Sequence, residues 1–397
     1  MIIQTKQPLF AGADEKAAVK TADGIIAQAV KCGASDIHIE PEEDGARVRL
    51  RTDGVLYEAA QLTKPVMQAV VSRIKVLAGM DIAEKRLPQD GSIKLELDGR
   101  SVDLRISTLP TILGEKAVIR ILDRERFALK LDELDFTAQN LELYRSLYSS
   151  GNGIVLLTGP TGSGKTTTLY ATLAELNSDE CNIVTVEDPV EYRIAGINQV
   201  AVNEKAGLTF ASGLRSILRQ DPDIMMIGEI RDLDTAQTAI HAALTGHLVL
   251  STLHTNSAAG AVVRLIDMGI EPFLVASALR GVVTQRLVRR ICPHCKTAYA
   301  ASVEEKAYLN VGAGAELTLY KGAGCEHCRG TGYLERMALQ EVMPVLPELK
   351  RFILKETHES VLFDETRKFG AVSMREDGVR KVLNGLTTVS ELLRAVH

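Results

Sequence analysis

The stretch 159-GPTGSGKTTTLY-170 constrains the fold of this 397-residue chain more than any other feature. It matches the pattern G-x-x-x-x-G-K-[ST] and lies between an apolar run, 154-IVLL-157, and a segment with helical character. In this strand–loop–helix context the pattern forms a phosphate-binding P-loop, not a chance glycine-rich turn. The sequence therefore predicts a nucleotide-binding α/β domain.

The residue types of the loop match the chemistry of a triphosphate. Glycines let backbone N–H groups close around a phosphate, and the helix N-terminus that follows adds partial positive charge. We expect Lys165 to reach the β- and γ-phosphate oxygens and Thr166 to offer its hydroxyl to Mg²⁺. ATP and Mg²⁺ are the expected ligands. The predicted nucleotide-binding residues are Gly159, Pro160, Thr161, Gly162, Ser163, Gly164, Lys165, Thr166 and Thr167.

Apolar segments that alternate with helix-length stretches begin at about residue 140, which is typical of a parallel α/β sheet. These segments are 154-IVLL-157, 183-IVTV-186, 224-IMMI-227 and 248-LVLST-252. After about residue 270 we expect the chain to be helical, with an interruption at a cysteine-rich region and short helices over 345–397.

Acidic residues follow two of these segments, at strand ends where ligands of open α/β sheets bind. Glu187, Asp188 and Glu191 follow one segment, and Glu229 follows another. A carboxylate there can hold the Mg²⁺ shell or orient the attacking water. Each acid taken alone is also compatible with a solvated loop. Spacing does not decide whether Glu187 or Glu229 is the base.

A histidine, His254, lies in the polar stretch 251-STLHTN-256 that ends a further predicted strand. The position is compatible with a contact to the γ-phosphate. It is equally compatible with a structural histidine.

The N-terminal part has a different pattern, which predicts a small α+β domain that ends near residue 125. A helix is expected over 22–33, ending at Gly33, and another over 64–79. Asp-Gly turns separate several of the expected strands. These strands are 35–41, 47–54, 55–59, 93–97 and 102–107.

Two Cys-x-x-Cys pairs, Cys292/Cys295 and Cys325/Cys328, predict a tetrahedral Zn²⁺ site made of four thiolates. The span between the pairs is longer than the roughly 15–20 residues usual for such sites. A redox pair and unmetallated thiols are the alternatives, and His294 or His327 is a possible substitute ligand. Arg289, Arg290, Lys296 and Arg329 are expected to offset the charge of the centre. Cys32 and Cys181 are expected to be plain buried residues.

Composition argues against two classes of protein. The net charge of −5, the absence of Trp and the 4% aromatic content do not favour a nucleic-acid-binding surface with stacking platforms. The apolar runs are far shorter than the roughly 20 residues of a membrane helix, and the first residues lack the plan of a signal peptide. We therefore expect a cytoplasmic protein that does not bind nucleic acid, in which paired cysteines favour metal.

With these motifs in this order, the chain resembles the secretion-superfamily ATPases of type II secretion and type IV pilus assembly. The resemblance covers almost the whole chain from about residue 20. In the N-terminal part it rests on SDIHIEP, RLRTDGVL, 86-RLPQDGSI-93 and 103-DLRISTLPTILGEKAVIR-120. In the motor part it rests on 187-EDPVEY-192 (the Asp box), 215-RSILRQDPDIMMIGEIRD-232 (the Walker B region) and 245-TGHLVLSTLHTN-256 (the His box).

The resemblance implies a RecA-like P-loop ATPase domain in a homo-hexameric ring, with ATP bound between the two domains of one subunit and the next. It implies that hydrolysis extrudes pilin-like subunits through an inner-membrane platform protein, with a membrane-anchored docking protein as a further partner. The chain is then peripheral at the inner membrane through these partners. Arginines implied near the nucleotide are Arg86, Arg105, Arg120 and Arg231, with Arg105 as first choice; a surface salt bridge is the alternative for each.

The tetracysteine region also bears on whether the chain resembles ATPases that assemble a filament or ATPases that retract one. In the resembled family it marks assembly and secretion ATPases, whereas retraction ATPases generally lack it. A secretion pseudopilus, a type IV pilus and a DNA-uptake filament all stay open as the client. A nucleic-acid translocase and a non-hydrolysing scaffold are the alternative functions.

Two departures from the family pattern qualify the resemblance. Relatives usually carry a further N-terminal docking domain, whereas residues 1–20 precede the small domain here, so either the chain is truncated or its docking differs. After the cysteines, 336-RMALQE-341 keeps Arg336 and Glu341 but alters the residues between them, which puts the role of Arg336 near nucleotide in doubt.

The predicted organisation has six segments. They are 1–20, a short N-terminal segment; 21–125, the α+β domain; 126–139, a linker; 140–290, the ATPase core; 291–335, the zinc subdomain; and 336–397, a C-terminal helical region.

Overall fold

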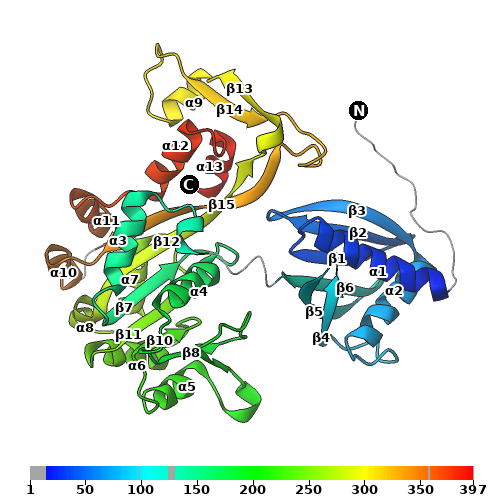
Figure 1. Ribbon diagram of the computed structural model, residues 1–397, viewed down its shortest axis with the longest axis horizontal. Helices are drawn as coiled ribbons and strands as arrows, with labels where there is room; N and C mark the ends of the chain where they lie inside the picture. Colours follow the sequence, from blue (N-terminus) through cyan, green and yellow to red (C-terminus); the bar gives the residue numbers. More distant parts are fainter. Residues whose placement is uncertain (1–14, 98, 124–129, 356–357, 397) are drawn as a thin grey trace. The chain divides into compact units, whose positions relative to one another are not determined.

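The computed structural model describes residues 15–97, 99–123, 130–355 and 358–396 (Figure 1). The chain divides into two compact units, Met1–Ala128 and Leu129–His397. Most of the predicted N-terminal segment (1–14) and part of the predicted linker (126–129) lie outside the described residues.

The first unit is a six-stranded antiparallel sheet with strand order β3-β2-β1-β6-β5-β4. Alternate residues of each strand, such as Ile37 and Ile39 of β1, pack against the two helices. Residues at the other alternate positions of the strand, such as Asp36 and Glu40, lie on the opposite face of the sheet. The elements are α1 (Glu15–Lys31), β1 (Asp36–Glu42), β2 (Gly45–Thr52), β3 (Val55–Thr63), α2 (Lys64–Leu77), β4 (Gln89–Leu97), β5 (Arg100–Thr111) and β6 (Gly114–Asp123).

The second unit is built on a seven-stranded sheet with order β15-β12-β7-β11-β10-β8-β9. Every pairing is parallel except that of β12 with β15. The strands are β7 (Gly153–Thr158), β8 (Ile183–Glu187), β9 (Asn198–Ala201), β10 (Ile224–Ile227), β11 (Leu248–Leu253), β12 (Leu279–Ile291) and β15 (Tyr333–Pro344).

Helices cover both faces of this sheet, as a buried parallel sheet requires (Figure 1). One face packs on α3 (Ala138–Tyr148) and α4 (Lys165–Leu176), and the short η2 (Leu131–Glu133) lies near α4. The other face packs on α5 (Phe210–Ile217), α6 (Leu233–Leu244), α7 (Ala258–Asp267), α8 (Pro272–Ala278), α10 (Pro347–Ile353) and α11 (Glu359–Lys368). The short η3 (Glu204–Ala206) precedes α5.

The cysteine region forms a small subdomain next to the last helices of the chain (Figure 1). Its antiparallel strands pair Lys296 with Gly322 and Ala300 with Thr318. Leu319 of this hairpin shares a core with Leu339 of β15 and Leu392 of the last helix. The elements are η4 (Pro293–Cys295), β13 (Lys296–Ala300), α9 (Val303–Tyr308), β14 (Thr318–Gly322), α12 (Met374–Leu383) and α13 (Val389–Ala395).

The expectation of helix after about residue 270 is wrong for two segments. Residues 279–291 form β12, and residues 336–344, assigned to a helical C-terminal region, belong to β15. In 279-LRGVVTQRLVRRI-291 the apolar residues recur every three to four positions, which suits a helix. Pairing with β7 on one side and β15 on the other overrides this period.

Smaller differences occur in the first unit. Helix α1 begins at Glu15 instead of residue 22, and β6 forms a strand that the pattern did not single out. Both helices predicted there are present, and β6 closes the sheet by pairing with β1 and β5.

Candidate active site

The P-loop follows β7 and leads directly into α4. All of β7 is buried, and Gly164 caps the helix in the left-handed conformation, with φ of 88°. A Cβ atom at Gly164 would lie 2.6 Å from the side-chain nitrogen of Gln285, so a larger residue would have to displace that amide, and the positive φ itself favours glycine. Thr161, Gly162 and Thr166 are exposed on the loop and the first helical turn.

Strand β12 supports this loop from the side. Gln285 Nε2 donates to the carbonyl oxygen of Ser163 at 2.7 Å, and Gln285 Oε1 accepts from the Thr168 hydroxyl at 2.9 Å. The hydroxyl oxygens of Thr158 and Thr284 are 2.8 Å apart. Sequence reasoning missed these supports because it placed residues 279–291 in a helix, although polar Thr284 and Gln285 within an apolar segment were a usable signal.

Lys165 begins α4 and is only 8% exposed. Its Nζ donates to the carbonyl oxygens of Gly159 at 2.8 Å and Pro160 at 3.1 Å. Burial lowers the pKa of Lys165 to about 8, while the charge of Glu229 raises it and that of Arg286 lowers it. The lysine therefore lies in the field of both groups.

Glu229 and His254 meet at the ends of adjacent strands β10 and β11. Ile227 and Ser251 are register partners, and His254 Nε2 lies 3.0 Å from a carboxylate oxygen of Glu229. Arg231 pairs with the other oxygen of Glu229, and it also lies 3.5 Å from Asp188. The structure thus brings the predicted Lys165, Glu229, His254 and Arg231 to one edge of the sheet.

Glu187 ends β8, next to β10, but its surroundings differ from those of Glu229. It is 3% exposed and accepts hydrogen bonds from the hydroxyls of Tyr170 and Thr185, the latter at 2.5 Å. The side chain of Gln199 donates to it at 3.1 Å. Burial raises the pKa of Tyr170, and the neighbouring Glu187 raises it further, so this phenol stays a donor. Glu191, three residues beyond Asp188, donates its backbone N–H to the Tyr170 oxygen at 3.3 Å.

The arginines expected from the first unit lie on that unit. Arg105 of β5 and Arg120 of β6 are register partners, and Arg120 Nε lies 3.2 Å from Asp36. Arg86 precedes β4, is 87% exposed at its side chain, and pairs with Glu84 at 2.8 Å. Arg105 carries interactions of its own within the described residues. Their roles toward nucleotide stay predictions.

The two residues retained in the altered motif after the cysteines, Arg336 and Glu341, lie in different environments. Arg336 is exposed and faces Arg289 in the β12–β15 ladder, at the cysteine end of the sheet. Glu341 is buried and accepts from the backbone N–H groups of Ala258 at 3.2 Å and Met374 at 3.3 Å. Burial raises the pKa of Glu341. This carboxyl thus joins the first turns of α7 and α12.

The four cysteines of the two pairs come together in the described part of the chain, with all four Sγ atoms within 4.8 Å of one another. Sγ–Sγ distances are 3.8 Å for Cys292–Cys325 and 3.7 Å for Cys295–Cys328. A zinc ion bound by four thiolates at about 2.3 Å places its sulfur ligands about 3.8 Å apart. The cluster therefore fits zinc.

Backbone N–H groups stabilise the thiolate form of Cys328. The N–H groups of Cys325 and Gly332 lie 3.1 and 3.2 Å from Cys328 Sγ. Burial opposes the thiolate, but these donors together with hydrogen bonds from the Cys325 and Cys295 thiols lower the pKa of Cys328 to about 6. His294 and His327 are not members of the described cluster; their rings stack at 4.0 Å between centroids.

Arg289 and Arg290 pair with Glu391 and Asp135. Their expected role in offsetting the charge of the cysteine centre stays a prediction. The expectation for Cys32 and Cys181 is wrong, because both side chains are half-buried, not buried.

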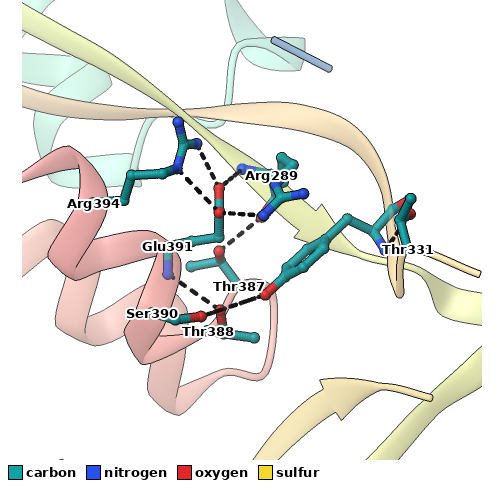
Figure 2. Close-up of polar contacts among 8 residues, drawn as sticks. Arg289, Thr331, Thr387, Thr388, Ser390, Glu391 and Arg394 are labelled. Carbon is teal, nitrogen blue, oxygen red and sulfur yellow. Dashed lines mark hydrogen bonds and ion pairs between the residues drawn. The ribbon is translucent and has the colours of Figure 1, made fainter. Parts of the chain in front are cut away.

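The pairing of Arg289 belongs to a polar network that ties α13 to β12 (Figure 2). Glu391 accepts from Arg289 and from Arg394, both at 2.7 Å, while the Thr387 hydroxyl donates to the Arg289 carbonyl at 2.7 Å. Burial opposes its charge, but Arg289 and Arg394 lower the pKa of Glu391 to about 2. The Tyr333 hydroxyl lies 2.9 Å from that of Thr388. The network anchors the last helix beside the cysteine subdomain.

None of the helices in the described ranges combines the length and the apolar character that a membrane-crossing helix needs.

Comparison with known proteins gives consistent matches over nearly the whole chain. The family profile T2SSE, described as type II/IV secretion system protein, matches residues 12–394. The chain is 49% identical over 388 residues to the type II secretion system ATPase E of Vibrio cholerae, covering 98% of this chain and 77% of that protein. It is 48% identical over 386 residues to the type IV pilus assembly ATPase PilB of Myxococcus xanthus, covering 96% and 68%.

The fold is similar to that of the ATPase DotB of Legionella pneumophila. The TM-score is 0.70 at 21% identity, over 98% of this chain and 97% of that one. Together with the cysteine cluster, this likeness confirms the predicted fold class: a RecA-like α/β core, a smaller α+β unit and a four-cysteine subdomain.

Proposed function

The chain belongs to the type II/IV secretion system protein family, and from this premise we propose that it hydrolyses ATP to power assembly of a type II secretion pseudopilus or a type IV pilus. Its relatives are named as ATPases of these two machines. The observation that carries the proposal is the convergence of Lys165, Glu229 and His254 at the carboxyl edge of the parallel sheet.

Each of these residues has a proposed task in hydrolysis. The P-loop N–H groups and Lys165 bind the phosphates of ATP. Glu229 orients the attacking water and accepts its proton, and His254 holds the Glu229 carboxylate in place, 3.0 Å away. Thr166 would supply an oxygen ligand to Mg²⁺, which would neutralise phosphate charge when bound. Glu187 positions α4 through Tyr170 and does not touch substrate.

Arginines are proposed to stabilise the charge that develops on the γ-phosphate. Arg105 is the first candidate, with Arg86, Arg120 and Arg231 as further ones. An arginine delivered to the γ-phosphate contributes about 10³–10⁵ in rate in finger-type systems. Arg105→Ala is expected to lower turnover, while wild-type turnover in that variant would remove Arg105 from the role.

The four cysteines are proposed to hold a structural Zn²⁺ that marks the chain as an assembly motor, not a retraction motor. Sulfur spacings of 3.7–3.8 Å support this. We expect one zinc per chain in metal analysis of the purified protein. A redox pair would instead show thiol content that changes with reductant and no bound metal.

The proposed assembly is a cytoplasmic homo-hexamer, peripheral at the inner membrane through a platform protein and a membrane-anchored docking protein. Nucleic acid is not a proposed partner. Arginines of the first unit are proposed to act on nucleotide in this ring.

The test of the proposed function is ATP turnover by the wild type and by Lys165→Ala. We expect the variant to lose turnover while its circular dichroism spectrum and thermal unfolding stay close to those of the wild type. A fragment of the membrane platform is expected to raise wild-type turnover, and DNA or RNA is expected to leave it unchanged. Full turnover by Lys165→Ala, or stimulation by nucleic acid alone, would overturn the proposal.

A further inference from the structure

Strand β12 brings an additional cation, Arg286, to the P-loop. Thr284 contacts Thr158 at the end of β7, and Gln285 donates to the Ser163 carbonyl. Arg286 follows these two residues directly. The strand therefore carries Arg286 alongside the loop that binds phosphate.

One terminal nitrogen of Arg286 is buried and has no hydrogen-bond partner in the part of the chain that the structure describes. Nη2 donates to Asn256 Oδ1, in the His box, at 3.0 Å. Nη1 is buried and has no hydrogen-bond partner among the described residues. Burying an unpaired donor of a charged group is costly, so such a group calls for an explanation by a ligand or another anion.

The other arginines of β12 have different surroundings. Arg289 and Arg290 pair with the carboxylates of Glu391 and Asp135. Arg280 donates to both the backbone carbonyl and the side-chain oxygen of Asn152, at the opposite end of the strand. Within the described ranges, Arg286 alone of these four lacks both a carboxylate and a second oxygen acceptor.

The charge of Arg286 acts on Lys165, the lysine of the P-loop. The charge of Arg286 lowers the pKa of Lys165, as expected for two cations that repel each other. Glu229, the acid that acts on Lys165, is already paired with Arg231 and His254. A guanidinium keeps its charge even when buried, so a phosphate group between the two cations would relieve the repulsion.

We propose that Arg286 binds the γ-phosphate of ATP from within the same chain, opposite Lys165, with Asn256 orienting its guanidinium. The inference rests on the proposed ATPase function. It adds a γ-phosphate ligand on β12 to the P-loop and to the arginines of the first unit. It also makes the site selective for ATP over ADP.

The test compares Arg286→Gln with the matched control Arg280→Gln, which removes an arginine of the same strand that is also bonded to an asparagine. Equilibrium binding of Mg-ADP and of the non-hydrolysable ATP analogue AMP-PNP is measured for each variant, together with kcat. Arg286→Gln is expected to weaken AMP-PNP binding about 10- to 100-fold, as a lost charge-assisted hydrogen bond does, and ADP binding less than about threefold. The control is expected to bind both nucleotides like the wild type.

The outcomes separate this inference from the proposed function. Wild-type affinity for AMP-PNP in Arg286→Gln, or an equal loss for ADP and AMP-PNP, overturns the γ-phosphate role. A wild-type protein that binds neither nucleotide contradicts the proposed function instead. If Arg286→Gln does not fold, Arg286→Lys replaces it: the charge remains without the planar fork, and a loss of about 3- to 10-fold is expected for AMP-PNP alone. An equal loss for ADP in that variant overturns the role as well.

Discussion

Two acidic strand ends lie side by side in the second unit and have opposite surroundings. Glu187 ends β8 and Glu229 follows β10, and these strands pair in parallel. Glu187 is buried among neutral donors: Tyr170, Thr185 and Gln199. Glu229 is bonded to groups that carry or can carry charge, at the edge where the P-loop lies.

The difference separates a carboxylate that holds the fold from one that is available for chemistry. Two of the donors to Glu187, Tyr170 and Thr185, are buried in the core, and removing the carboxylate would leave them without this acceptor. The partners of Glu229 are exposed side chains, Arg231 and His254, which can be exchanged for water. We therefore propose the base role for Glu229 and a positioning role for Glu187.

The largest expected effect comes from Glu229→Gln. The amide keeps the shape of the side chain but cannot accept a proton from water, so we expect kcat to fall about 10²- to 10⁴-fold. Binding of AMP-PNP is expected to change less than about threefold. Steady-state ATPase kinetics and equilibrium binding measure the two quantities. Turnover within tenfold of the wild type would break the assignment.

Glu187→Gln is the matched substitution on the neighbouring strand and has the next largest effect. Its NH₂ group replaces an oxygen that accepts from Tyr170 or from Thr185 and Gln199, so at least one of these hydrogen bonds is lost or reversed, and we expect the free energy of unfolding to fall by about 1–3 kcal/mol. Turnover of the folded enzyme is expected to stay within about tenfold. Denaturant unfolding and ATPase kinetics at one temperature measure both. A collapse of kcat at unchanged stability would exchange the roles of the two acids.

The smallest expected effect concerns pH. The pKa of Lys165 is about 8 in the protein without nucleotide, and phosphate binding favours its protonated form. Protonation is complete below that pKa and is lost above it. The affinity for AMP-PNP is therefore expected to be level at lower pH and to fall as pH rises through about 8, by about tenfold per unit beyond it.

Variants at both acids sharpen this pH comparison. Glu229 raises the pKa of Lys165, so Glu229→Gln is expected to move the midpoint of the decline to lower pH, whereas Glu187→Gln leaves it in place. Lys165→Arg keeps its charge throughout and is expected to flatten the profile between pH 7 and 9. Titrations of AMP-PNP affinity measure all four proteins. Equal midpoint shifts for the two acid variants would contradict the separate environments.

Much of the candidate site could be predicted from short stretches of sequence. The P-loop is recognisable because its residues are adjacent and each is required locally, as the φ of Gly164 illustrates. The cysteine cluster was predictable because two short knuckles each bring a pair of thiols together, and only their meeting needs the fold. The positions of the acids at strand ends were predictable because the apolar runs before them have the length of buried strands.

Contacts between distant segments were not predictable in the same way. The apolar period of residues 279–291 favours a helix, whereas these residues form β12. The sequence pattern therefore does not indicate that Gln285 supports the P-loop or that Arg286 lies beside it. Arg289, expected beside the cysteines, is held by Glu391 of the last helix (Figure 2). Side-chain partners of this kind depend on packing that local pattern does not encode.

By itself the sequence determined that this protein has a P-loop, acids at the ends of neighbouring strands and two thiol pairs. These features depend on residue types at short spacing. Only the tertiary structure decided which acid is buried and which lies with Lys165, and that β12 lies against the P-loop. The reason is that burial, hydrogen bonding and electrostatic fields are set by groups far apart in the chain. Glu187 and Glu229 are both glutamates at the ends of apolar strands, and the fold places different groups around them.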